Sequence, residues 1–174
     1  MDQKISKLAQ EYRRLAVEIL KEAIRIPADY VDRPLEEGGD PDCGLSNHEG
    51  PRLEYLRKKT QKPELIPSSG VIAAIKSRAL GLFLRLPFKV SAPARTAEVA
   101  ESAELQDLER DWAEVQSAWR DFLEDFPTEL AGKAVYKHPV AGRLNLEQTL
   151  RFLIDHLRRH TRQIERALAE GLAP

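Results

Sequence analysis

Cysteine is almost missing from this chain of 174 residues, which contains only Cys43. A single cysteine excludes an intramolecular disulfide bond and a zinc site built from several cysteines. This usage is typical of proteins in a reducing compartment, so we expect a cytoplasmic location. The length suffices to bury a sizeable core, and we expect one domain that spans residues 1–174.

Long hydrophobic runs and an excess of one charge are also missing. No apolar run is long enough to span a bilayer, and the segment MDQKISKLAQEY has no apolar signal core. The formal net charge of -1 provides no extended field for a polyanion. Because no groove-reading motif is present either, we do not expect nucleic-acid binding.

Apolar residues at steps of three and four predict four amphipathic helices. These helices are expected at residues 3–26, 70–86, 102–126 and 145–170. The third helix carries both Trp112 and Trp119 on its apolar face, which we interpret as core rather than as a cofactor site. No convincing strand pattern is present. The predicted fold is therefore an all-α four-helix bundle.

Prolines and glycines interrupt residues 27–69, where Pro occurs six times and Gly four times. This composition predicts a long connection between the first two helices, with at most a short helical turn near residues 52–59. A loop of this length within a compact domain is usually functional or disordered. His48 lies in the connection, and either it is solvated or it folds over a site.

The predicted helix at residues 70–86 combines an apolar stripe with basic residues. No acidic residue occurs between Glu64 and Glu98. A basic amphipathic helix can lie on an anionic membrane surface. We favour a core helix with a basic outer face, capped by Ser68 or Ser69, and do not expect membrane binding. The stripe that we expect to be buried consists of Ile72, Ile75, Ala79, Leu82 and Leu86.

The last predicted helix carries two histidines one turn apart. Asn145 is expected to be its N-cap, with Gln148 completing a capping box. His156 and His160 are four residues apart, so their ring nitrogens can converge on one point. This spacing is a common way to present two metal ligands, although the glutamate of the H-E-x-x-H motif is missing. Alternatively, both histidines are boundary residues that contact water and polar neighbours.

The segment HPVAGRLNLEQTLRFLIDHLRRHTRQI, residues 138–164, resembles the C-terminal signature of the DinB/YfiT-like superfamily. The preceding linker LPFKVSAPAR and the helix after it are also similar to that family, so the resemblance extends over residues 85–168. By this resemblance the fold is a four-helix bundle. Many members of the family hold a divalent metal ion, often zinc or nickel, through one histidine of the second helix and two of the fourth.

The resemblance implies a set of metal ligands. His156 and His160 match the two histidines of the fourth helix. The histidine of the second helix is missing, and the run KISKLAQEY places Glu11 at its position, whereas a shift of one residue would place Gln10 there. A set of Glu11, His156 and His160 would suit zinc, or iron(II), with open positions for a substrate.

The family's first helix has no counterpart before residue 3. Three explanations remain open. The helix at residues 70–86 takes the place of that helix, a partner chain supplies it, or the first helix begins earlier than predicted. His138, followed by Pro139, is interpreted as structural.

The resemblance also implies an activity. Known members include metal-dependent hydrolases and S-transferases that use bacillithiol, mycothiol or glutathione. We therefore expect a metal-dependent hydrolase or thiol-dependent S-transferase that acts on a small molecule, with zinc, nickel or iron as cofactor. The alternative is a metal-free, non-catalytic bundle that serves as an interaction or stress-associated protein. In either case we expect a homodimer.

Overall fold

The computed structural model describes residues 2–25, 45–86 and 105–171. Within these ranges the chain forms five α-helices and one small two-stranded sheet, which confirms the predicted all-α class. The helices are α1 (Gln3–Ala23), α3 (Leu45–Thr60), α4 (Val71–Arg85), α5 (Leu105–Glu124) and α6 (Leu146–Gly171), and the strands are β1 (Tyr136–His138) and β2 (Gly142–Leu144).

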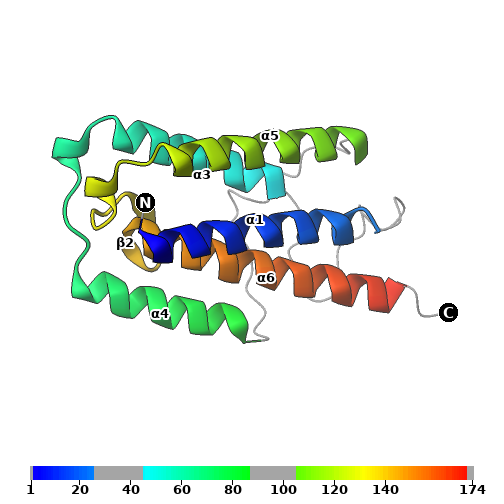
Figure 1. The fold of residues 1–174 in the computed structure, drawn as a ribbon. Coiled ribbons are helices and arrows are strands. Elements are labelled where there is room, and N and C mark those ends of the chain that lie inside the picture. Colours follow the sequence, from blue (N-terminus) through cyan, green and yellow to red (C-terminus); the bar gives the residue numbers. More distant parts are fainter. Residues whose placement is uncertain (1, 26–44, 87–104, 172–174) are drawn as a thin grey trace.

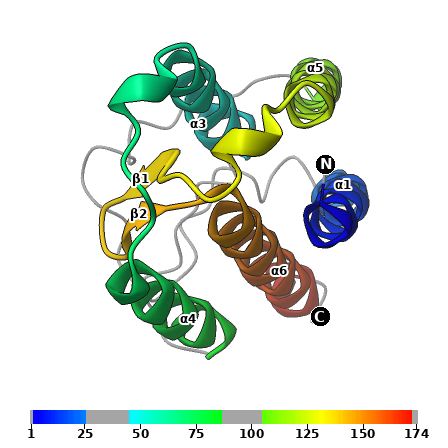
Figure 2. The ribbon, with the colours of Figure 1, turned by 60° about the vertical axis from the view of Figure 1, so that its left-hand side comes forward.

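Four of the helices, α1, α3, α5 and α6, surround one apolar core (Figures 1 and 2). Helices α1 and α6 run in one direction, whereas α3 and α5 run in the other (Figure 1). The α1–α6 contact is the most extensive between described elements, and α5 packs against both α3 and α1. Trp112 and Trp119 are buried in this core, as their place on the apolar face of α5 predicts.

Helix α3 corrects the prediction that residues 27–69 contain at most a short helical turn. It is 16 residues long, and its Leu53 and Leu56 are buried against α5. Pro51 lies inside α3 and reads as a helix breaker in the sequence, since proline removes a backbone hydrogen bond. The missed helix supplies the fourth side of the bundle. The predicted connection at residues 27–44 lies outside the described part of the chain.

Helix α4 lies outside the bundle and packs on α6 and β2 (Figure 2). Its N-cap is Gly70, so the predicted caps Ser68 and Ser69 are wrong. Leu84 and Gly81 face α6, and a Cβ added at Gly81 would lie 2.8 Å from a carboxylate oxygen of Asp155. The helix therefore approaches α6 closely through its less apolar side.

The apolar stripe of α4 was predicted to be buried, and this prediction is wrong. Ile72, Ile75 and Leu82 are 63–71% exposed. Periodicity identifies an apolar face, but it does not identify what covers that face. Neither α4 nor any other helix in the described ranges is long and apolar enough to cross a membrane.

A short antiparallel hairpin, β1–β2, precedes the last helix. Its turn is fastened by His138, whose Nδ1 accepts hydrogen bonds from the backbone N–H groups of Val140 and Ala141, both at 3.1 Å. Gly142 follows with a φ of +81°, a conformation that glycine adopts without strain. Strands of three residues are too short to show alternation, so the sequence analysis missed them.

The start of α6 is fixed by a reciprocal pair of hydrogen bonds. Gln148 N donates to Asn145 Oδ1 at 2.9 Å, and Asn145 N donates to Gln148 Oε1 at 3.0 Å. This arrangement satisfies backbone donors that the helix itself cannot satisfy. The predicted capping box is therefore confirmed, and it sets the register of the histidines further along α6.

Candidate functional site

His156 and His160 form a contacting pair on α6. Their Nε2 atoms are 3.1 Å apart, and their ring centres are 4.4 Å apart with the planes at 87°. Both side chains are half-buried. Two imidazoles on one tetrahedral zinc ion, each with a Zn–N bond of about 2.05 Å, place their nitrogens about 3.3 Å apart. The observed separation therefore fits two positions around a single ion.

Arg52 of α3 reaches this pair from across the bundle. One of its guanidinium nitrogens, Nη2, lies 3.5 Å from Nε2 of His156. Arginine can only donate, so in this contact the lone pair of His156 Nε2 faces the guanidinium. The Nε2 atoms of both histidines therefore point to one place at the edge of α6, which Arg52 adjoins.

An aromatic ring holds both partners of this contact in place. Phe152 stacks on His156 with ring centres 5.5 Å apart, and the Arg52 guanidinium lies 5.4 Å from the centre of the same Phe152 ring. A cation over an aromatic face is stabilised by the ring quadrupole. Arg52 was missed by the sequence analysis because it lies 104 residues from His156 in the chain.

Gln163 lies on the same edge of α6, three residues after His160. Its buried Oε1 atom has no hydrogen-bond partner within the described part of the chain. A buried acceptor without a partner costs about 1–3 kcal/mol. A ligand or water molecule that donates to Gln163 would remove this cost, so the edge that carries the histidines also offers a polar anchor.

Glu11, a residue of α1, contacts a different side of α6 from the one that carries the histidines. Its carboxylate forms an ion pair with Arg158, which is two residues from each histidine. Two residues correspond to about 160° around a helix, so Arg158 and the histidines lie on opposite sides of α6. The structure thus brings His156 and His160 together and does not bring Glu11 to them. Gln10, the alternative match, is exposed on α1.

A complete set of protein ligands for a metal ion is not assembled among the described residues. In residues 2–25, 45–86 and 105–171, no three His, Cys, Asp or Glu side chains gather into a potential metal site. Cys43 lies outside these ranges, and for His48 only the place in α3 is described. The two histidines of α6 are the part of the predicted site that the geometry supports.

His138 takes no part in this pair. Burial, followed by the positive charge of Arg52, lowers the pKa of His138 from 6.5 to about 4. The ring is therefore neutral near pH 7, which suits its role as acceptor for two backbone N–H groups of the hairpin turn. This geometry agrees with the predicted structural role of His138.

A comparison with protein families supports the resemblance. The family model described as the DinB superfamily matches residues 72–164, which is more than half of the chain. The matched region runs from α4 to α6 and contains both histidines, but it leaves out Glu11 and Arg52. No curated protein and no solved structure matches the chain.

Proposed function

The chain belongs to the DinB superfamily, and from this membership and the histidine pair we propose that it is a metal-dependent hydrolase or thiol-dependent S-transferase. His156 and His160 bind the divalent ion, with zinc and nickel as the first candidates and iron(II) as a further one. The observation that supports this proposal is the separation of 3.1 Å between their Nε2 atoms.

Two imidazoles are fewer protein ligands than a catalytic zinc ion usually has. The remaining positions are therefore left to water and to the substrate. A bound divalent ion would supply Lewis acidity, which lowers the pKa of a coordinated water molecule or substrate thiol. The residues around the pair would orient that substrate.

Arg52 provides the charge for this task. Its guanidinium lies 3.5 Å from His156 and repels a cation placed between the histidines. An anionic substrate group, such as a thiolate or carboxylate, would draw Arg52 towards itself and relieve the repulsion. Metal ion and anionic substrate would therefore strengthen each other's binding. The amide oxygen of Gln163 would accept a hydrogen bond from the same substrate.

Metal analysis of protein purified without a polyhistidine tag tests the proposal. We expect one divalent ion per wild-type chain, and at least tenfold weaker zinc binding by titration calorimetry in His160→Ala. The matched control is His138→Asn, which removes a histidine outside the pair and should bind zinc like the wild type. Wild-type protein without stoichiometric metal, or equal metal content in His160→Ala, would contradict the proposal.

The role of Glu11 is decided by the same titration. Because its carboxylate is paired with Arg158 on the opposite side of α6, we expect Glu11→Gln to bind zinc like the wild type. The lost ion pair is partly exposed and should cost less than about 1 kcal/mol of unfolding free energy. A tenfold loss of zinc affinity in Glu11→Gln would instead support the three-ligand set suggested by the sequence.

A second candidate is a metal-free bundle without catalytic activity, which acts as a dimeric interaction or stress-associated protein. Two contacts favour it: Arg52 lies against His156, and Glu11 is paired with Arg158. In this case the Arg52 guanidinium, rather than a metal ion, is the positive charge beside the histidine pair. Metal-free wild-type protein that forms a dimer in light scattering would support it, whereas a metal-loaded monomer would exclude it.

A further inference from the structure

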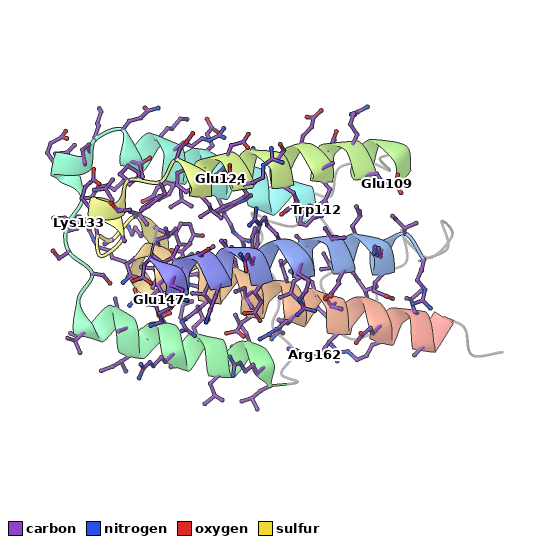
Figure 3. The ribbon with its side chains drawn as sticks, viewed as in Figure 1. Glu109, Trp112, Glu124, Lys133, Glu147 and Arg162 are labelled. Carbon is purple, nitrogen blue, oxygen red and sulfur yellow. The ribbon has the colours of Figure 1, made fainter. Side chains whose placement is uncertain are left out.

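Helix α4 presents an apolar face to solvent. Its side chains project away from the bundle along the whole helix (Figure 3). At 100° per residue, the six exposed apolar residues between Val71 and Leu86 cover an arc of about 120°, which is a typical width for an apolar helix face. Soluble proteins rarely expose a continuous apolar patch of this kind without a function for it. The exposed fractions are 78% for Val71, 71% for Ile72, 64% for Ile75, 63% for Leu82, 40% for Phe83 and 41% for Leu86.

Basic residues border this face on both sides. Lys76 and Arg78 are exposed, and on the helical wheel they flank the apolar arc at its two edges. Arg85 lies two turns after Arg78, on the same edge. The sequence has no acidic residue from position 65 to position 97. The face is therefore apolar in the middle and positive at its margins.

An arginine-lined cleft adjoins the end of α4. The cleft has a volume of about 410 Å³ and lies between α4 and α6. Leu86 belongs both to the cleft and to the apolar face. Two of the arginines are held by neighbours: Arg162 donates to the Leu84 carbonyl at 2.8 Å, and Arg85 donates to Asp155 at 3.2 Å. The lining residues are Arg85, Leu86, Arg159, Arg162, Glu165, Arg166 and Ala169.

The cleft concentrates positive charge. Four arginines line the cleft beside Glu165, and Asp155 pairs with Arg85, so cationic groups still outnumber the carboxylates, and such an excess favours an anion in the cleft. Guanidinium groups bind phosphate with two parallel hydrogen bonds, so a phosphate group suits this lining.

We propose that α4 docks on the surface of a membrane rich in anionic phospholipids. The helix lies in the plane of the interface, with its apolar face in the boundary between headgroups and acyl chains. Lys76 and Arg78 contact the headgroup layer on either side, and the arginine cleft receives a lipid phosphate. This docking is independent of the histidine pair and of any activity there.

Charge distinguishes this occupant from a second copy of the chain. In a symmetric dimer through α4, the basic margins of one copy would face the basic margins of the other. No acidic residue of α4 could pair with them, and like charges in contact oppose association. An anionic lipid surface complements both the apolar centre and the positive margins. Each lysine or arginine near such a surface strengthens binding about fivefold.

Sedimentation with vesicles tests the proposal on the full chain. We expect the protein to sediment with vesicles of phosphatidylserine and phosphatidylcholine at low salt, and at least tenfold less with phosphatidylcholine alone. The double variant Ile75→Ser/Leu82→Ser should lose binding at least tenfold. Both positions are exposed, so helical content should not change. The matched control Val17→Ser/Val140→Ser removes exposed apolar side chains elsewhere and should bind like the wild type.

Charge and depth are measured separately. Lys76→Gln/Arg78→Gln should weaken binding to anionic vesicles by at least tenfold, whereas Lys21→Gln/Lys137→Gln, which changes exposed lysines elsewhere, should not. In Leu82→Trp the new indole should shift its fluorescence to the blue when vesicles are added. Trp112 and Trp119 are already buried and contribute a constant background. Simple adsorption through charge would leave the emission of the new indole unchanged.

Three results would overturn the proposal. The first is no sedimentation of wild-type protein even at low salt. The second is wild-type protein that does not bind vesicles but forms a dimer, which dissociates in Ile75→Ser/Leu82→Ser. This result would assign the face to a second copy of the chain. The third is a lower melting temperature of that variant without vesicle binding, which would show that the chain itself covers the face. His160→Ala should bind vesicles like the wild type, so failure of the metal proposal leaves this test intact.

Discussion

At the scale of single residues, His138 links the hairpin to pH. Its pKa is about 4 in the folded protein and 6.5 as a free side chain, so between these values the unfolded chain binds the extra proton. The contribution of His138 to the free energy of unfolding is fully present above pH 6.5. It falls as the pH decreases towards 4, by at most about 1.4 kcal/mol per pH unit. Urea unfolding at a series of pH values measures this slope.

His138→Asn is the matched variant for this prediction. The Asn Oδ1 atom can accept the two backbone hydrogen bonds of the turn, but the side chain does not titrate. The variant should show a smaller loss of stability between pH 6.5 and pH 4. An unchanged slope would mean that other groups cause the acid sensitivity.

The residue scale also shows where prediction from sequence stops. His156 and His160 are four residues apart on one helix, so local spacing alone predicts that they meet. Arg52 and Glu11 depend on how helices are placed relative to one another. Glu11 and its partner Arg158 are 147 residues apart in the chain, and periodicity carries no information about such a pair.

At the scale of elements, α3 gives the sharpest prediction. Leu56 is fully buried between α3 and the rest of the bundle. Leu56→Ala should therefore lower the free energy of unfolding by about 2–5 kcal/mol through lost burial and a residual cavity. The same substitution at Leu65, which is 63% exposed, should change it by less than about 0.5 kcal/mol. Chemical denaturation measures both, and equal effects would remove α3 from the core.

Helix bounds followed from the sequence wherever apolar residues repeat over several turns. For α1, α4 and α6 and for the C-terminal end of α5, the predicted and observed ends differ by a few residues. The predicted start of α5 at residue 102 lies outside the described residues. Helix α3 was missed because, among its residues whose side chains are described, only Leu53 and Leu56 are buried, and Pro51 interrupts the pattern. For α4 the helix was predicted, but its orientation was not. Which face of a helix is covered depends on neighbours far away in the sequence.

At the scale of the whole molecule, one core connects the bundle helices. Trp112 donates from its indole N–H to the Ala16 carbonyl of α1 at 2.8 Å, and Trp119 packs on Tyr12 with ring centres 5.5 Å apart. Tryptophan fluorescence should therefore report the loss of the whole core. We expect its unfolding curve to coincide with that of far-ultraviolet circular dichroism, as in a single cooperative transition. Loss of helix before loss of the tryptophan signal would show that α3 or α4 unfolds separately.

The parallel pairing of α1 with α6 has a consequence for how the protein is made. Lys4 contacts Glu147 at the beginning of both helices, and Glu11 contacts Arg158 further along. A ribosome releases α1 first and α6 last. The apolar face of α1 therefore lacks its main partner, α6, until most of the polypeptide has been synthesised. Closure of the bundle core therefore waits until α6 has left the ribosome, and a pairing between helices so far apart in the chain slows folding.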